Sequence, residues 1–177
     1  MSNIYSEVLA AVERGEAATL RTEFTGTEGV IAEGLKKAIA PYAPQTDVRG
    51  RRFADVTLTE SDGRFTVGEP FSPPERLIIL GAGHIALPVC DFAAKSGFEV
   101  YVCDDRPAFA NTARFPLAQE VLCDSFKNCI SRLRLTSYDY VVVITRGHTH
   151  DADCLRTIFK GTQPAYLGLI GSRRRVR

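Results

Sequence analysis

The segment best suited to chemistry is LIILGAGHIA (77–86), which places the pattern G-x-G-x-x-A directly after an apolar run. In this pattern Gly81 makes a tight turn, Gly83 lets the backbone approach a pyrophosphate, and Ala86 takes a packing position. The N-terminus of the following helix offers N–H groups and a partial positive charge to phosphate oxygens. The segment predicts a dinucleotide site. Its predicted binding residues are Gly81, Ala82, Gly83, His84 and Ile85.

An acidic residue follows at the spacing expected for a carboxylate that holds a ribose hydroxyl. Asp104 comes 23 residues after Gly81, at the end of the apolar run FEVYVC (98–103), where about 20 residues are usual. A carboxylate there favours NAD over NADP, because a 2′-phosphate would meet its negative charge, although Arg106 could offset that charge. We expect NAD or NADP as cofactor, with NAD favoured. The predicted binding residues here are Asp104, Asp105 and Arg106.

A second constellation, TRGHTHD (145–151), follows the apolar run YVVVIT (140–145). With His84 it holds all three histidines of the chain. We expect them to face one crevice, where His84, His148 and His150 are candidates for proton transfer to a ligand. Metal binding by His148, His150 and Asp151 is an alternative, but only two imidazoles are close in sequence, and we assign no metal site. A third interpretation is that these residues only cap a helix.

The predicted cofactor site also includes residues of two further segments, which follow the apolar runs 140–145 and 165–171. Gly171 and Ser172 open the basic stretch GSRRRVR (171–177), where Ser172 could cap a helix and the arginines could reach phosphate or carboxylate groups. A frayed basic end is an equal interpretation. The remaining predicted cofactor-binding residues are Thr145, Arg146, Gly147, Ser172 and Arg173.

Alternating strand and helix patterns must position these segments. Apolar runs separated by helical patterns predict repeated β-α-β units, and right-handed crossovers then give a doubly wound parallel sheet. We predict an α/β fold, a Rossmann-like sheet in the order 3-2-1-4-5, whose first and fourth strands flank the ligand crevice. The predicted strands are 77–80, 98–103, 120–123, 140–145 and 165–171, and the predicted helices cover 84–96, about 130–135 and 150–160.

A proline-rich stretch, PFSPPE (70–75), predicts a boundary between a small N-terminal α+β unit (1–72) and the Rossmann-like domain (73–177). We expect the second domain to end before its last helix. In the first unit the patterns predict a helix, a strand, a second helix and a hairpin with an Asp-Gly turn. These lie at 4–14, at 17–24, through Val30 and Ile39 up to Pro41, and around 61–63.

The composition limits the function classes. The chain has 177 residues, 22 basic and 21 acidic, and a net charge of +1, which argues against a nucleic-acid binder. No apolar run approaches the length of a membrane span, and the N-terminus has no signal-peptide pattern. The five cysteines show no metal-ligand spacing and are interpreted as reduced thiols that pack as small hydrophobic residues. We therefore expect a cytoplasmic protein.

Four ordered motifs resemble the XdhC/CoxI family of xanthine dehydrogenase accessory proteins, specifically its C-terminal Rossmann domain. They are LIILGAGHIA (77–86), GFEVYVCDDRPAFANTARFP (97–116), YVVVITRGHTHD (140–151) and YLGLIGSRRR (166–175). Residues 1–70 contain neither the G-S-S-P-R-like segment nor the Gly-Gly pair before Glu that typical members carry. The resemblance implies a maturation factor that binds molybdenum cofactor, supports its sulfuration and delivers it to a molybdenum hydroxylase apoenzyme.

The function expected from the residues and the resemblance together is that of an accessory factor for a molybdenum hydroxylase. Its Rossmann crevice would bind a dinucleotide or a molybdopterin-type ligand. Two alternatives stay open at this point: an NAD(P)-dependent oxidoreductase in which a histidine moves a proton, and a module that senses nucleotides without chemistry. A homodimer is also left open.

Overall fold

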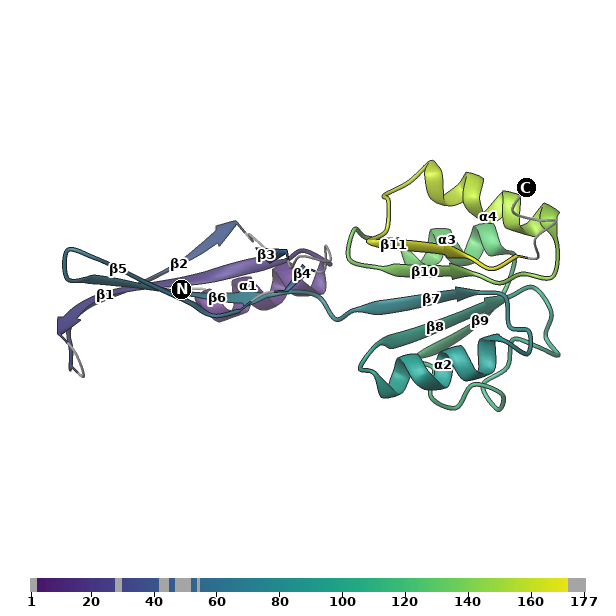
Figure 1. Cartoon of the computed structure of the whole chain (residues 1–177), viewed down its shortest axis with the longest axis horizontal. Coiled ribbons are helices and arrows are strands. Elements are labelled where there is room, and N and C mark those ends of the chain that lie inside the picture. Colours follow the sequence, from purple (N-terminus) through teal and green to yellow (C-terminus); the bar gives the residue numbers. More distant parts are fainter. Residues whose placement is uncertain (1–2, 28–29, 42–44, 47–51, 54, 172–177) are drawn as a thin grey trace. The chain divides into compact units, whose positions relative to one another are not determined.

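The structure, a computed structural model, divides the chain into two compact units, Met1–Pro73 and Pro74–Arg177 (Figure 1). It describes residues 3–27, 30–41, 45–46, 52–53 and 55–171. Among these residues, no helix combines the length and the apolar character that a membrane crossing requires.

The C-terminal unit contains a five-stranded parallel sheet in the order β11-β10-β7-β8-β9. Numbered within this unit, that order is 5-4-1-2-3, which confirms the predicted doubly wound arrangement. Each strand lies within two residues of its predicted bounds. The strands are β7 (Arg76–Leu80), β8 (Glu99–Asp104), β9 (Glu120–Cys123), β10 (Tyr140–Val143) and β11 (Tyr166–Leu169).

Helices cover both faces of this sheet, with α2 on one face and α3 and α4 on the other (Figure 1). Alternate residues of β7 serve the two faces: Ile78 and Leu80 pack under α3 and α4, whereas Leu77 and Ile79 pack under α2. Strands buried on both sides in this way have continuous apolar sequences. The helices are α2 (Ala86–Lys95), α3 (Phe126–Leu133) and α4 (His148–Phe159).

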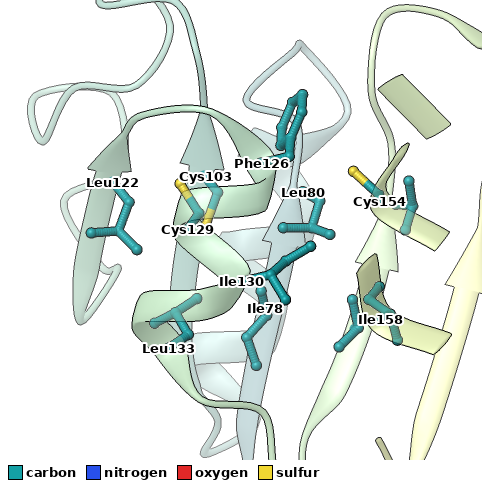
Figure 2. Close-up of a cluster of buried hydrophobic side chains, with 12 residues drawn as sticks. Ile78, Leu80, Cys103, Leu122, Phe126, Cys129, Ile130, Leu133, Cys154 and Ile158 are labelled. Atoms are coloured by element: carbon teal, nitrogen blue, oxygen red, sulfur yellow. The ribbon is translucent and has the colours of Figure 1, made fainter. Parts of the chain in front are cut away.

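Three cysteines belong to the core beneath α3 and α4. Figure 2 shows Cys103 of β8 beside Cys129 of α3, with Cys154 on α4. All three are buried, as is Cys90, and none forms a disulfide. Burial raises the pKa of Cys154 to about 12, so its thiol stays protonated and behaves as a small hydrophobic side chain. Cys123 differs from the sequence expectation because it is exposed.

A buried ion pair fixes the start of the sheet opposite the predicted site. Asp139, which is buried, accepts hydrogen bonds from Arg76 Nε at 2.7 Å and Nη2 at 2.6 Å. It also accepts one from the Thr136 N–H at 2.6 Å. The hydrogen bonds with Asp139 raise the pKa of Arg76 above its ordinary value. The pair therefore joins the beginning of β7 to the loop that leads into β10.

The N-terminal unit is built on an antiparallel sheet in the order β2-β1-β6-β5. Helix α1 begins after Asn3, whose side-chain oxygen accepts the Tyr5 N–H, and it buries Val8 and Ala11. The elements are α1 (Ile4–Glu13), β1 (Ala18–Thr27), β2 (Val30–Pro41), β3 (Gln45–Thr46), β4 (Arg52–Phe53), β5 (Thr57–Ser61) and β6 (Arg64–Phe71).

The second helix predicted in this unit is wrong, because residues 30–41 form strand β2. The segment pairs with β1 along almost its whole length, from Val30 to Pro41. The side chains of Leu35 and Ile39, two of the apolar residues of this segment, are 56% and 40% exposed. An apolar pattern this short fits either element, and here the hydrogen-bonded ladder with β1 decides between them.

The predicted hairpin is confirmed, with β5 and β6 joined by Asp62 and Gly63. Both turn residues have positive φ values, 52° and 71°, as a two-residue turn that matches the twist of the strands requires. Strand β5 is exposed along its whole length, and its Leu58 side chain is 65% exposed.

Candidate functional site

A pocket of about 650 Å³ lies at the carboxyl ends of β7, β8 and β10. In a doubly wound sheet this is the place where the strand order reverses and ligands bind. The lining combines the glycine turn after β7 with the segments that follow β8, β10 and β11. The lining residues are Gly83, His84, Ile85, Arg106, Phe109, Arg114, Ile144, Thr145, Arg146, Ile170 and Gly171.

Gly81 is required by the fold itself. Its φ is +116°, and a Cβ there would lie 2.5 Å from the backbone oxygen of Ile144. Its N–H donates to the Cys103 carbonyl at 2.8 Å. The turn is therefore held against the ends of both β8 and β10, and no side chain fits between them.

Gly83 has no such role in the fold. Its φ lies outside the left-handed region, and a Cβ there would meet nothing within 4 Å, although the residue lines the pocket. The N–H groups of Gly83, His84 and Ile85 find no hydrogen-bond acceptor among the residues that the structure describes. Three consecutive unpaired donors in the turn that leads into α2 are suited to phosphate oxygens.

Ala82 and Ala86 are buried and do not line the pocket. Both are buried in the core under α2, as the packing position of the motif requires. The Ala82 N–H is already committed, since it donates to Asp104 Oδ2 at 2.8 Å. Its carbonyl accepts a hydrogen bond from Arg114 Nη1 at 2.9 Å.

Asp104 is almost sealed from solvent, with an exposed fraction of 1%. Besides Ala82, its carboxylate accepts hydrogen bonds from the N–H, Nε and Nη2 of Arg106 at 3.0, 2.8 and 2.9 Å. Burial alone would raise the pKa of this carboxyl, but the hydrogen bonds from Arg106 and from the backbone outweigh it and lower the pKa to about 2. The carboxylate is therefore charged, and both of its oxygens accept hydrogen bonds from Ala82 or Arg106.

All three charged side chains described on the pocket lining are arginines. The guanidinium of Arg106 lies over the ring of Phe109 at 3.7 Å, and that of Arg114 lies 5.0 Å from the same ring. Arg114 also donates to the Phe109 carbonyl at 2.9 Å. Arginine binds phosphates with a planar pair of donors, so the lining favours an anionic ligand.

The third arginine, Arg146, links two of the segments around the pocket. Its Nη1 and Nη2 donate to the two carboxylate oxygens of Asp105 at 2.7 and 3.0 Å. Because Arg146 follows β10 and Asp105 follows β8, this ion pair passes the end of β7, which lies between those strands. Both side chains are partly exposed, so the pair is open to competition from a phosphate group.

The loop between β10 and α4 is held by Thr145 and Asp151. The Thr145 hydroxyl donates to the buried carboxylate of Asp151 and accepts the Gly147 N–H at 3.4 Å. Gly147 is the residue before α4. Asp151 lies in the first turn of that helix, where a negative charge is favourable. Asp151 therefore holds the loop before α4 and lies at the favourable end of the helix dipole, but it does not cap the helix by a side-chain hydrogen bond, as one interpretation of the sequence expected.

Two of the three predicted histidines, His84 and His150, lie in different places. His84 is exposed and lines the pocket. His150 instead packs its ring edge-to-face against Phe126 of α3, with 5.6 Å between ring centroids. His150, Cys154 and Ile158 recur every four residues and share the core-facing side of α4. The expectation that His150 faces the crevice therefore differs from the structure. The side chain of His148 lies outside the described part of the structure.

The predicted cofactor residues divide into three groups. Those on the pocket lining are Gly83, His84, Ile85, Arg106, Thr145 and Arg146. Gly81, Ala82, Asp104, Asp105 and Gly147 hold the frame around it through hydrogen bonds and close packing. Ser172 and Arg173 lie outside the described residues. Within the part of the chain that the structure describes, no three histidine, cysteine or acidic side chains gather as metal ligands.

Sequence reasoning missed Phe109 and Arg114 as lining residues. Both lie in the long connection between β8 and β9, within the segment FANTARFP (109–116). An arginine between two phenylalanines in a loop that follows the second strand was the available signal. Arg114 contacts both rings, at 5.0 Å from Phe109 and 5.5 Å from Phe115.

Comparison with known proteins identifies the family. Residues 77–177, more than half of the chain, match the model of the XdhC Rossmann domain. The chain belongs to the XdhC family. This result confirms the resemblance seen in the motifs, and the matched range includes the whole described lining of the pocket.

Two curated relatives extend the comparison. This XdhC chain is 33% identical over 138 residues to a probable xanthine dehydrogenase subunit from Bacillus subtilis (strain 168), covering 77% of this chain and 41% of the relative. It is 32% identical over 104 residues to the uncharacterized protein YqeB of Escherichia coli (strain K12), covering 58% of this chain and 18% of YqeB. The first alignment is longer than the C-terminal unit and so reaches into the N-terminal unit as well.

A solved structure shares the fold. A crystal structure described as a xanthine dehydrogenase from Bacillus halodurans matches 97% of this chain with a TM-score of 0.66 and 24% identity, and this match covers 51% of that chain. The XdhC chain thus spans about half, or less, of the length of the relatives and the solved structure that it matches.

Proposed function

We propose that this XdhC protein is an accessory factor for a molybdenum hydroxylase of the xanthine dehydrogenase type. Its Rossmann pocket binds the phosphate groups of a dinucleotide or of a molybdopterin-type ligand. The observation that carries the proposal is the pocket at the end of β7, where unpaired N–H groups at Gly83–Ile85 face the same space as three arginines.

We assign a role in this proposal to each part of the pocket. The N–H groups of residues 83–85 receive the pyrophosphate, and the open space at Gly83 lets it come close to the backbone. Arg146 supplies a cation at the β10 side once an anion competes for its bond with Asp105. A molybdopterin-type ligand also carries phosphate, which fits these donors. We assign none of these residues to the molybdenum atom itself.

The partner is inferred from a relative. The protein from Bacillus subtilis is named as one subunit of a xanthine dehydrogenase, and that name implies association with a hydroxylase. We place the present protein in the cytoplasm, where its five free cysteines stay reduced.

Co-purification tests the partner. The tagged full-length chain should retain the molybdenum hydroxylase from its own source, and the bound apoenzyme should gain activity when cofactor is supplied with the chain. An Arg146→Ala variant, which weakens the pocket at the β10 side, should lower this gain. Arg156→Ala is the matched control, because Arg156 pairs with Asp153 on the exposed surface of α4. A failure of both association and activation would contradict the accessory role.

One observation favours a second candidate, an NAD(P)-dependent oxidoreductase: the exposed imidazole of His84 lines the pocket and could move a proton. Steady turnover of NAD(P)H with a carbonyl substrate, lost in His84→Ala, would favour this candidate over the accessory role. Nucleotide binding without turnover and without a partner would favour a sensing module.

A further inference from the structure

We propose that the dinucleotide bound by this pocket carries an additional phosphate on the 2′-hydroxyl of its adenosine ribose, as NADP does. The inference rests on the proposed function, in which a dinucleotide lies with its pyrophosphate at Gly83–Ile85. The specificity-determining residues are Arg106 and Arg114, and the preference for NAD that the position of Asp104 suggested is reversed.

The Asp104 carboxylate is not available to a ribose. A ribose binds such a carboxylate by donating its two hydroxyl groups to the oxygens. Here both oxygens already accept hydrogen bonds from Ala82 and Arg106, four in all, and the residue is 1% exposed. A ribose diol would have to displace a charged, bidentate partner to reach it, so Asp104 does not select NAD.

Arg106 lies at the pocket surface in place of that carboxylate. It covers Asp104 and lines the pocket, and the stacking of its guanidinium on Phe109 at 3.7 Å fixes the plane of that group. Its Nη1 donates to none of the described residues. A preoriented guanidinium with a donor to spare is suited to a phosphate monoester.

The charge around this position is positive. Arg106 is neutralised in part by Asp104, but the guanidinium of Arg114 donates, among the described residues, only to the carbonyls of Ala82 and Phe109. Within the described ranges no carboxylate pairs with Arg114. Because Phe109 contacts both guanidinium groups, the two cations lie on one side of the pocket. Asp105 also lies near Arg106 but is paired with Arg146, so the three arginines outnumber the two carboxylates by one, and a 2′-phosphate would offset this net positive charge.

The topology places this charge where a 2′-phosphate would lie. Gly83 follows β7 and Arg106 follows the neighbouring strand β8. In a doubly wound sheet the adenosine half of a dinucleotide extends from the glycine turn toward the end of that neighbouring strand. The ribose 2′ position then faces Arg106, whereas the other half of the ligand extends toward Thr145 and Arg146 at the end of β10.

Calorimetric titration of the full-length chain with NADP and NAD tests the inference, with 2′,5′-ADP and 5′-ADP as shorter probes. The wild-type chain should bind NADP at least tenfold more tightly than NAD, and 2′,5′-ADP more tightly than 5′-ADP. Arg106→Ala should reduce the NADP preference at least tenfold while NAD affinity stays constant or rises, since Asp104 becomes available to the ribose. Arg132→Ala, which breaks an exposed pair with Glu120 elsewhere, should leave the preference unchanged.

Arg114→Ala provides a second variant that leaves the Asp104 pair intact, in case Arg106→Ala does not fold. It should also lower the preference for NADP over NAD. Equal affinities of the wild-type chain for NADP and NAD would overturn the inference and leave the dinucleotide site in place. A folded Arg106→Ala variant with an unchanged preference would overturn the role of Arg106. Absence of binding by all four nucleotides would contradict the dinucleotide site on which the inference rests, and would leave the molybdopterin-type ligand of the proposed function to be tested separately.

Discussion

Replacing Asp104 by asparagine removes the charge that ties the glycine turn to the end of β8. The amide can still accept the Ala82 N–H, but it no longer balances the guanidinium of Arg106. Removing one partner of a buried pair costs about 3–5 kcal/mol. The Arg106 side chain is 30% exposed and can turn to water, so we expect a cost at or below the bottom of this range, roughly 2–3 kcal/mol.

The pKa of Asp104 gives an independent magnitude for the same interaction. The difference between its ordinary pKa of 3.8 and its value of about 2 in the folded chain corresponds to about 2 kcal/mol. Since the pKa is lowered by folding, this stabilisation is fully present above the unfolded value and is lost as the pH falls toward the folded value. About half of it should be gone at pH 3.

Urea unfolding followed by circular dichroism measures both effects. At pH 7 the midpoint of Asp104→Asn should fall by roughly 2 M, given a slope of about 1–1.5 kcal/mol per M for a unit of this size. Hydrogen exchange of β7 peptides assigns the transition to the C-terminal unit. Asp105→Asn is the matched control, because its pair with Arg146 is partly exposed and is worth less than about 1 kcal/mol.

Either of two results would contradict this role of Asp104. One is a midpoint for Asp104→Asn equal to that of Asp105→Asn at pH 7. The other is a stability difference between wild type and Asp104→Asn that stays constant from pH 7 to pH 3.

Two further predictions concern the frame of the pocket and of the sheet. Gly81→Ala places a Cβ 2.5 Å from the Ile144 oxygen at a φ of +116° and should lower the free energy of unfolding by more than about 2 kcal/mol. Gly83→Ala, in contrast, should melt within a few degrees of wild type. Equal melting temperatures for the two variants would contradict this assignment. Asp139→Asn leaves Arg76 without its buried partner and should cost about 3 kcal/mol or more in urea unfolding; a loss below about 1 kcal/mol would show that the pair is dispensable.

The sheet and the place of the pocket could be predicted because both follow from the alternation of apolar runs and helical patterns along the sequence. Continuous apolar runs such as 140–144 separated by helical patterns leave few topologies, and the glycine turn then marks one end of the sheet. The segment 30–41 could not be resolved in this way, because its apolar residues fit a helix and a strand equally. Only the pairing with β1 decides, and that contact is not local in sequence.

The site residues were predicted by type and position but not by orientation. The spacing of Asp104 from Gly81 does not reveal that Arg106, two residues later, folds back onto the carboxylate. The spacing of His150 from Cys154 does carry information, since residues four apart share one side of a helix. Because Cys154 is buried in the core, this spacing pointed His150 to the interior.

The central claim, that a pyrophosphate lies against the backbone at residues 83–85, is tested most directly by titrating NADP into Gly83→Val. The valine side chain fills space that is open in the wild type, so the fold should be kept while binding weakens at least 100-fold. Gly161→Val is the matched control, because its Cβ would meet only one atom, at 3.8 Å, away from the pocket. An affinity of Gly83→Val equal to that of wild type and Gly161→Val would contradict the claim.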